Sequence, residues 1–289
     1  MNAGAREKSF AKGVFWMVLT AIAFSILAVA VRGLSNKFPA AEIVMVRALV
    51  GLFMIVPLIG KSGLRSLRTR QIPLHLLRTG FSFIAMLGFF YALGYVTVAD
   101  VTAFSFLIPL FTTIAAALIL GEAVDAPRWL ATIVGFMGAL VIIRPGFQII
   151  SFPAMVAISS AVFYAGAWTT VKFLTRTDSA SVIVFYLNAF MLPLALAVSL
   201  FFWVTPAWED IPLLFIMALS GWAAHFCQAR SFAAADASAV VPFDFLRLPF
   251  GALLAWILFG QPTDSWTWAG AAIIFASGWF ISWRESRAS

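Results

Sequence analysis

The chain has 289 residues, of which 63% are hydrophobic and only 11% are charged, and its formal net charge is +7. Soluble domains contain about 45–50% apolar and about 25% charged residues, so this composition excludes a disordered chain, a soluble enzyme domain and a nucleic-acid module. Because a transmembrane helix needs about 20 apolar residues, ten such helices would occupy most of the chain. The sequence therefore predicts an all-α, polytopic membrane protein.

Apolar segments alternate with short polar stretches, and their hydropathy gives ten predicted spans. The first follows the polar residues 1–12 and is too long for the apolar core of a cleaved signal peptide, so we interpret it as a membrane span. The predicted spans are 13–33, 39–60, 72–94, 98–120, 128–144, 152–173, 180–203, 210–230, 237–259 and 266–283.

The distribution of Lys and Arg predicts the orientation of these spans. If the N-terminus is cytoplasmic, 13 of the 19 basic residues lie in cytoplasmic tails and loops, three lie in outer loops and three lie within spans. Such a bias follows the positive-inside rule, so we expect both termini in the cytoplasm. Membrane topology thus explains the net charge of +7 without a nucleic-acid partner. The single cysteine, Cys227, allows no internal disulfide.

Ionisable residues occur in the second and third spans, although charge within a membrane is costly. We expect Glu42 and Arg47 in the second span to stabilise the fold or a gate. His75, Arg78 and Ser82 follow helical spacing in the third span, so they share one face and are candidates for the substrate path. Because His75 and Arg78 lie near one end of this span, their side chains could instead extend to the lipid headgroups.

Polar and aromatic residues share faces of the sixth and eighth spans. Ser160, Tyr164 and Trp168 are four residues apart in the sixth span, where the two rings could stack on a substrate or hold an ammonium group. His225 and Gln228 share a face of the eighth span. We predict that both faces line the path; the alternatives are lipid-interface contacts for the rings and a helix–helix hydrogen bond for His225.

The ninth span contains an acid and a base three residues apart, Asp244 and Arg247. On one helical face, Arg247 could bind a substrate carboxylate and Asp244 an ammonium group. The alternative is an internal ion pair that fixes the packing of the helices. Either interpretation places this pair near the middle of the membrane.

The two halves of the chain resemble one another at a shift of 139 residues. The matches at this shift include Phe24 with Phe163, Lys37 with Arg176, Gly121 with Gly260, Asp125 with Asp264 and Trp129 with Trp268. Each half contains five spans, an odd number, so the second half must enter the membrane from the opposite face. We therefore predict an inverted repeat, with the halves at 1–146 and 147–289, an architecture that secondary transporters use.

Each half also ends in the same motif, a proline-interrupted helix that closes on Gly-Glu or Gly-Gln and is followed by a Gly-rich helix. The first copy contains Pro109, Gly121, Glu122, Gly135 and Gly138, and the second contains Pro249, Gly260, Gln261, Gly270 and Gly278. In these features the whole chain resembles the EamA type of the drug/metabolite transporter superfamily, apart from Gln261, where Glu is usual. Among the members it looks most like bacterial exporters of amino acids, including the aromatic amino-acid exporters.

This resemblance implies a central cavity lined by spans 1, 3, 4, 6, 8 and 9 that opens alternately to the two sides of the bacterial inner membrane. The sequence contains neither a phosphate-binding loop ending in Lys-Ser/Thr nor a His-Glu-x-x-His motif. We therefore predict a secondary transporter without enzymatic activity or cofactor, whose partners are a small-molecule substrate and the lipid bilayer, and which can act as a monomer. Its predicted activity is the export of small amphipathic metabolites, above all amino acids including aromatic ones.

Three alternatives remain open from the sequence. The first is a carrier of the same superfamily for a larger metabolite, such as S-adenosylmethionine or a nucleotide sugar. A membrane enzyme would need clustered interfacial His, Asp or Glu residues, and an ion channel would need a ring of like charges or a filter loop.

Overall fold

The computed structural model describes residues 3–59, 67–108, 110–111, 114, 126–143, 151–235 and 240–288. All regular structure within these ranges is helical, which confirms the predicted all-α class. Pro109, Gly121 and Glu122 of the first motif lie outside the described residues, as do parts of the predicted fourth and fifth spans.

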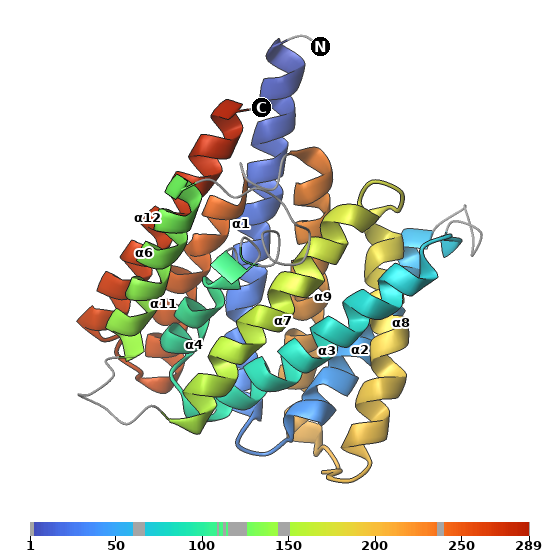
Figure 1. Ribbon diagram of the computed structural model, residues 1–289. Helices are drawn as coiled ribbons and strands as arrows, with labels where there is room; N and C mark the ends of the chain where they lie inside the picture. Colours follow the sequence, from blue (N-terminus) through green and yellow to red (C-terminus); the bar gives the residue numbers. More distant parts are fainter. Residues whose placement is uncertain are drawn as a thin grey trace.

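The helices follow the two predicted halves in order (Figure 1). The first half contains α1 (Ala3–Leu34), α2 (Ala40–Ile59), α3 (Ile72–Tyr95), α4 (Val98–Ser105) and α6 (Ala126–Ile143). The second half contains α7 (Phe152–Leu174), α8 (Ala180–Ser199), the 3₁₀ helix η3 (Trp208–Asp210), α9 (Ile211–Ala234), the 3₁₀ helix η4 (Val241–Leu246), α11 (Arg247–Phe259) and α12 (Ser265–Ala288).

Short polar residues determine where several helices begin. The hydroxyl oxygens of Thr97, Ser151 and Ser179 accept hydrogen bonds from the first-turn amides of α4, α7 and α8. Each cap satisfies an N–H group that the helix itself leaves without a partner. At the other end of α11, Gly260 adopts φ +62°, the left-handed conformation that ends many helices and favours glycine.

The predicted ninth span differs from the structure, because it is not one regular helix. It consists of η4 followed directly by α11. Pro242 lies in the first turn of η4 and Pro249 is the third residue of α11. A proline has no N–H to donate and is tolerated in a first turn, where that group would have no helical partner. The two prolines therefore suit two successive helix starts better than one uninterrupted helix.

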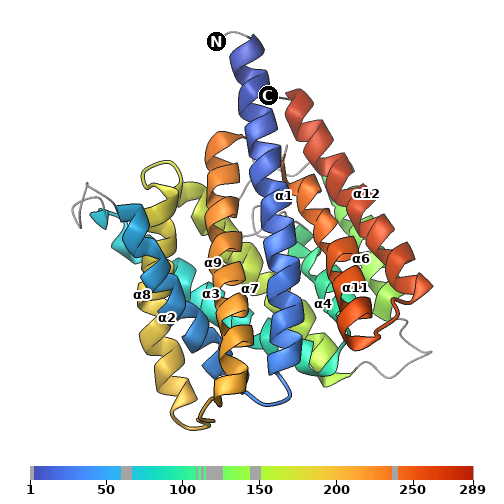
Figure 2. The same cartoon turned by 180° about the vertical axis from the view of Figure 1, so that it is seen from behind.

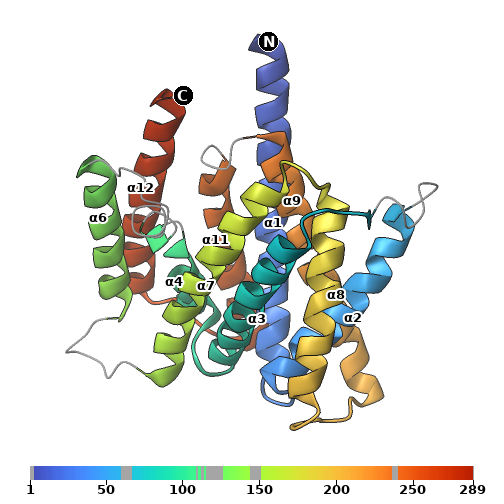
Figure 3. The same ribbon diagram turned by 45° about the vertical axis from the view of Figure 1, so that its right-hand side comes forward.

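Helix packing relates the two halves by an approximate two-fold axis. The first helix of each half packs against the third helix of the other, so that α1 contacts α9 and α3 contacts α7. Equivalent helices also pair across the axis, namely α2 with α8, α4 with α11 and α6 with α12. The pairs α6–α12 and α2–α8 form opposite edges of the bundle (Figure 3).

The repeat is inverted, as its odd number of helices predicts. In Figure 1 and in the reverse view of Figure 2, α1 and α7 run in opposite directions, and the start of α1 and the end of α12 lie at the same end of the bundle. Within the described ranges, five helices are long and apolar enough to cross a membrane, and they belong to α1, α3, α7, α8 and α9.

Candidate substrate site

A small cavity lies between the two halves, at the centre of the bundle. Its volume is about 20 Å³, which is room for about one water molecule. The lining comes from α1, α3, α4, α7 and α11, together with one residue that follows α4. The lining residues are Phe24, Leu27, Ala28, Phe89, Phe90, Thr102, Ser105, Ile108, Tyr164, Trp168 and Arg247. In this conformation the helices are closed around the centre, and a metabolite would need them to move apart.

Arg247 provides the charged group of this cavity. Its Nη2 lies 2.7 Å from Oδ2 of Asp244, and both side chains are buried. The two align because Arg247 directly follows the 3₁₀ helix that contains Asp244, and its backbone N–H donates to the carbonyl oxygen of Asp244, as in a further 3₁₀ turn. The guanidinium carbon also lies 5.3 Å from the ring centre of Phe24 and 5.6 Å from that of Phe106, within the range of a cation–π contact.

The Asp244–Arg247 pair is held in place by α1. The hydroxyl of Ser25 donates a hydrogen bond to the carbonyl oxygen of Arg247 at 3.0 Å, which fixes the start of α11 against α1. Oδ1 of Asp244 and Nε of Arg247 have no hydrogen-bond partner in the described part of the chain. The pair therefore retains one acceptor and one donor at the centre of the protein.

Two aromatic residues of α7 form the opposite wall. Tyr164 and Trp168 both line the cavity, and Tyr164 meets Phe89 of α3 edge-on at a ring distance of 6.0 Å. Ser160 lies one turn earlier, and its hydroxyl donates a hydrogen bond to the carbonyl oxygen of Val156 at 2.8 Å. It packs against Gly88 of α3, where an added Cβ would lie 2.4 Å from the hydroxyl oxygen of Ser160. Ser160 therefore lies between two helices and is not part of the lining.

Two candidate residues of α3, His75 and Arg78, form polar contacts with the second half of the chain. Nε2 of His75 lies 2.8 Å from Oδ2 of Asp178, which also accepts a hydrogen bond from Thr69 at 2.7 Å. Nη1 of Arg78 donates to the carbonyl of Ile183 at 2.6 Å. His75, Arg78 and Ser82 are all buried, so these side chains do not extend to the headgroups. The contacts of His75 and Arg78 are with α8 and with the turn before it.

The polar residues of α9 lie beside the cavity. His225 meets the ring of Phe24 edge-on at 5.4 Å, and His225 and Gln228 are buried. Among the residues described here, the two ring nitrogens of His225 have no hydrogen-bond partner. The same is true of Nε2 of Gln228. The helix–helix hydrogen bond considered for His225 is therefore not formed in this conformation.

Glu42 and Arg47, both on α2, differ in their surroundings. Oε2 of Glu42 accepts a hydrogen bond from the amide of Val204 at 3.1 Å, which ties α2 to the segment before α9. Arg47 is only 1% exposed, and its Nε and Nη2 have no partner in the described ranges. Glu42 thus has a structural contact, whereas Arg47 retains free donors in the interior.

Several lining residues were not candidates from the sequence. Thr102 and Ser105 are polar and three residues apart in α4, a signal that could have identified them. No comparable signal distinguishes Phe24, Phe89 and Phe90, because the chain contains 30 phenylalanines. Within the described residues, no three His, Cys, Asp or Glu side chains gather where they could hold a metal ion.

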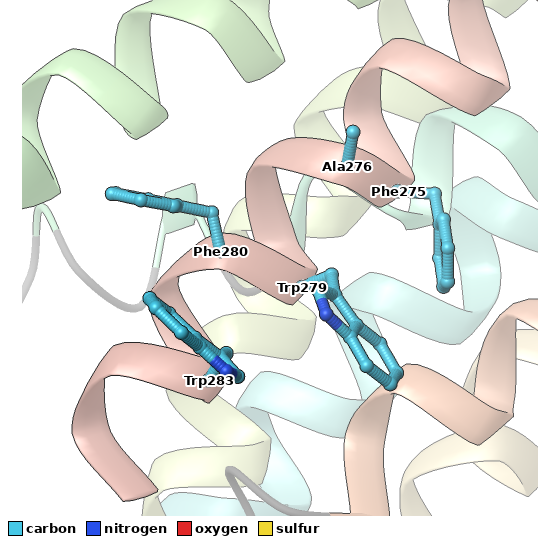
Figure 4. Close-up of a pocket in the computed structure, with 5 residues that line it drawn as sticks. All are labelled: Phe275, Ala276, Trp279, Phe280 and Trp283. Carbon is cyan, nitrogen blue, oxygen red and sulfur yellow. The ribbon is translucent and has the colours of Figure 1, made fainter. Parts of the chain in front are cut away.

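A second hollow lies on the outside of the bundle, along α12. Its lining residues all belong to this one peripheral helix, as Figure 4 shows. They are Phe275, Ala276, Trp279, Phe280 and Trp283. Trp279, Phe280 and Trp283 are 41–46% exposed, as expected for rings that face lipid. We therefore place the candidate site in the central cavity.

Comparisons with known proteins agree with this architecture. A riboflavin transporter of Vibrio cholerae is 34% identical over 287 residues, which cover 96% of this chain and 95% of that protein. A riboflavin transporter of Rhizobium johnstonii is 32% identical, with 95% of this chain and 92% of that protein covered. An S-adenosylmethionine uptake transporter of Rickettsia prowazekii is 29% identical, with 97% and 95% covered.

The fold is also found among solved structures. One crystal structure matches 96% of this chain and 99% of its own chain with a TM-score of 0.71 at 15% identity. The model of the EamA-like transporter family matches twice, at residues 11–144 and 151–283, once in each half. The chain therefore belongs to the EamA-like transporter family, as a multi-pass membrane protein built from two copies of the family's five-helix repeat.

Proposed function

We propose that the chain is a secondary transporter of the bacterial inner membrane that carries a flavin, riboflavin or a close relative. This replaces amino-acid export as the leading interpretation, because the relatives described above are named for riboflavin and S-adenosylmethionine. Their names favour the alternative that the sequence left open, a carrier for a larger metabolite. Their matches run over nearly the whole chain, so the central region is included.

The observation that carries this proposal is the aromatic wall of the cavity around Arg247. Phe24, Phe89, Phe90, Tyr164 and Trp168 come from three different helices and surround one space. Flat rings of this kind stack on a fused ring system such as a flavin. A guanidinium group presents donors in a planar fork, which suits the adjacent carbonyl and nitrogen acceptors of the flavin ring.

S-adenosylmethionine is the second candidate, since several relatives are named for it. It carries a positively charged sulfonium, which the aromatic wall could contact by a cation–π interaction but which a carboxylate without a basic partner would bind best. The carboxylate beside the cavity, Asp244, is already paired with Arg247. The charges at the centre therefore favour the flavin over the sulfonium compound.

We further propose that transport occurs by alternating access between the two repeats. The closed cavity of about 20 Å³ must enlarge before a flavin can enter. An inverted repeat provides two related ways of opening, one to each side of the membrane. The excess of basic residues in predicted cytoplasmic loops supports cytoplasmic locations for both termini.

Counterflow in proteoliposomes tests the proposed substrate. Vesicles loaded with unlabelled riboflavin should accumulate labelled riboflavin, and those loaded with tryptophan or S-adenosylmethionine should not. Trp168→Ala should reduce the initial rate about 3- to 10-fold, because one aromatic stacking contact is lost. Trp208→Ala is the matched control, since Trp208 lies outside the cavity and is 88% exposed. Exchange of S-adenosylmethionine or tryptophan without exchange of riboflavin would overturn the proposal.

A further inference from the structure

Two buried arginines of the interior have no acidic partner among the residues that the structure describes. Arg47 on α2 is 1% exposed and Arg78 on α3 is 3% exposed. The ion pairs among the described residues are Lys37–Asp210, His75–Asp178 and Arg247–Asp244. Arg47 and Arg78 are close enough to interact electrostatically with each other, as like charges. Within the described ranges, no carboxylate compensates either of these two positive charges.

Free donors accompany this charge. Nε and Nη2 of Arg47 and Nε of Arg78 lack hydrogen-bond partners in the part of the chain that the structure describes. Both guanidinium groups act electrostatically on His225, whose two ring nitrogens are also without partners. Arg47, Arg78 and His225 come from three helices, α2, α3 and α9, and we call them the basic cluster.

Two members of the basic cluster, Arg47 and His225, lie next to the central cavity. Arg47 and the lining residue Leu27 both pack against Gly221 of α9. A Cβ added to this glycine would lie 2.9 Å from the Cδ of Arg47 and 3.4 Å from the side chain of Leu27. The glycine leaves the space that the arginine side chain occupies. His225 contacts a further lining residue, Phe24, at a ring distance of 5.4 Å.

A buried charge without a partner is unfavourable, and one guanidinium beside another adds repulsion. An anionic group of the substrate would remove both penalties. Guanidinium groups bind phosphate through paired, charge-assisted hydrogen bonds. A phosphate monoester carries about −1.5 to −2 charges near pH 7, which matches the charge of two arginines better than a single carboxylate does.

We propose that the basic cluster is an oxyanion subsite, and that the preferred substrate carries a phosphate monoester, as in a flavin 5′-phosphate. The aromatic wall would bind the ring system, while Arg47 and Arg78 bind the phosphate. The flavin part of this inference rests on the proposed function, whereas the phosphate subsite does not depend on it.

The test compares two matched ligand pairs on the purified full chain in detergent, by titration calorimetry. The pairs are riboflavin with riboflavin 5′-phosphate, and adenosine with adenosine 5′-monophosphate. The phosphate member of the flavin pair should bind about 10- to 100-fold more tightly, the gain typical of hydrogen bonds to a charged group. The same direction of preference should appear in the adenosine pair.

Three arginine variants then locate the preference. Arg47→Gln and Arg78→Gln should each reduce it to less than about threefold, and Arg47→Lys should retain part of it, because the charge remains but the fork is lost. Arg230→Gln is the matched control, since Arg230 is exposed and stacks on Trp16 and Phe226. Without ligand, the midpoint temperature of thermal unfolding should rise or stay constant in Arg47→Gln. If Arg47 had only a structural role, this substitution would lower the midpoint.

The outcomes separate the two proposals. Equal binding of both members of each pair by the wild-type protein would overturn the phosphate subsite without any variant. A phosphate preference that survives Arg47→Gln and Arg78→Gln would do the same. If riboflavin shows counterflow but no phosphate preference is found, the proposed function stands and the phosphate subsite does not. If the adenosine pair shows a phosphate preference but no flavin is transported, the subsite stands and the flavin is excluded as the substrate.

Discussion

His75 lies 2.8 Å from Asp178 and joins the start of α3 to the turn between α7 and α8. Lys37 pairs with Asp210 and joins the turn between α1 and α2 to the start of α9. The two connections occupy equivalent positions in the two repeats. Each links the turn after the first helix of one repeat to the start of the third helix of the other. They lie at opposite ends of the bundle (Figure 1). The two pairs therefore connect corresponding segments at opposite ends of the protein.

We propose that the His75–Asp178 pair keeps its end of the protein closed, so its loss should open that end. Asp178→Asn removes the charge that His75 and Thr69 share, in a site where the His75 side chain is fully buried. A hydrogen bond to a charged group contributes about 1.5–3 kcal/mol, so the equilibrium should shift toward the open form about 10-fold or more. The measurement is the rate of alkylation of Ser82→Cys, introduced together with Cys227→Ser, because Ser82 is buried on the same face of α3.

Asp210→Asn is the control for this prediction. Its partner Lys37 is 46% exposed, and exposed ion pairs contribute little. Alkylation of Ser82→Cys should therefore change much less than in Asp178→Asn. Equal alkylation rates in the wild-type background and in Asp178→Asn would contradict a closing role for the His75–Asp178 pair.

The ion pair beside the cavity should behave as a unit. Asp244→Ala and Arg247→Ala each leave a buried charge unpaired, so each should lower the free energy of unfolding by about 3–5 kcal/mol. The double variant should lose less than the sum, because it leaves neither charge behind. Equilibrium unfolding in mixed micelles measures all three, and strictly additive losses would show that the two side chains act independently.

The α6–α12 contact depends on two glycines. A Cβ on Gly138 would lie 2.8 Å from the carbonyl oxygen of Gly270, and a Cβ on Gly270 would lie 2.5 Å from that of Gly138. Since backbone atoms cannot move aside cheaply, each substitution by alanine should cost about 1–3 kcal/mol. Gly80→Ala is the matched control, because nothing lies within 4 Å of its Cβ position. Thermal unfolding of the three variants tests the prediction, and equal midpoints would exclude a close contact.

Topology can be tested at the two ends of the chain. The start of α1 and the end of α12 lie at the same end of the bundle (Figure 2), and the basic loops predict that this end is cytoplasmic. A fluorescent protein that matures only in the cytoplasm should therefore fluoresce when fused to either terminus. Alkaline phosphatase, which is active only outside, should be inactive at both positions. Fluorescence at one terminus alone would contradict an even number of spans.

The sequence by itself determined where most of the described helices are and that the chain contains a repeat. The predicted spans 72–94 and 180–203 correspond to Ile72–Tyr95 and Ala180–Ser199, because length, hydropathy and caps such as Ser179 act locally. The sequence also suggested the Asp244–Arg247 ion pair as one of two interpretations. Residues three apart along a helical segment lie next to each other whatever the rest of the fold is.

The tertiary structure decided which helices meet and which polar groups are left without partners. His75 pairs with Asp178 across 103 positions, and Gly221 makes room for Arg47 from a different half of the chain. Hydropathy could not reveal these contacts, because lipid-facing and protein-facing sides of a membrane helix are both apolar. For the same reason, whether an arginine such as Arg47 is paired or free depends on neighbours that only the folded protein brings together.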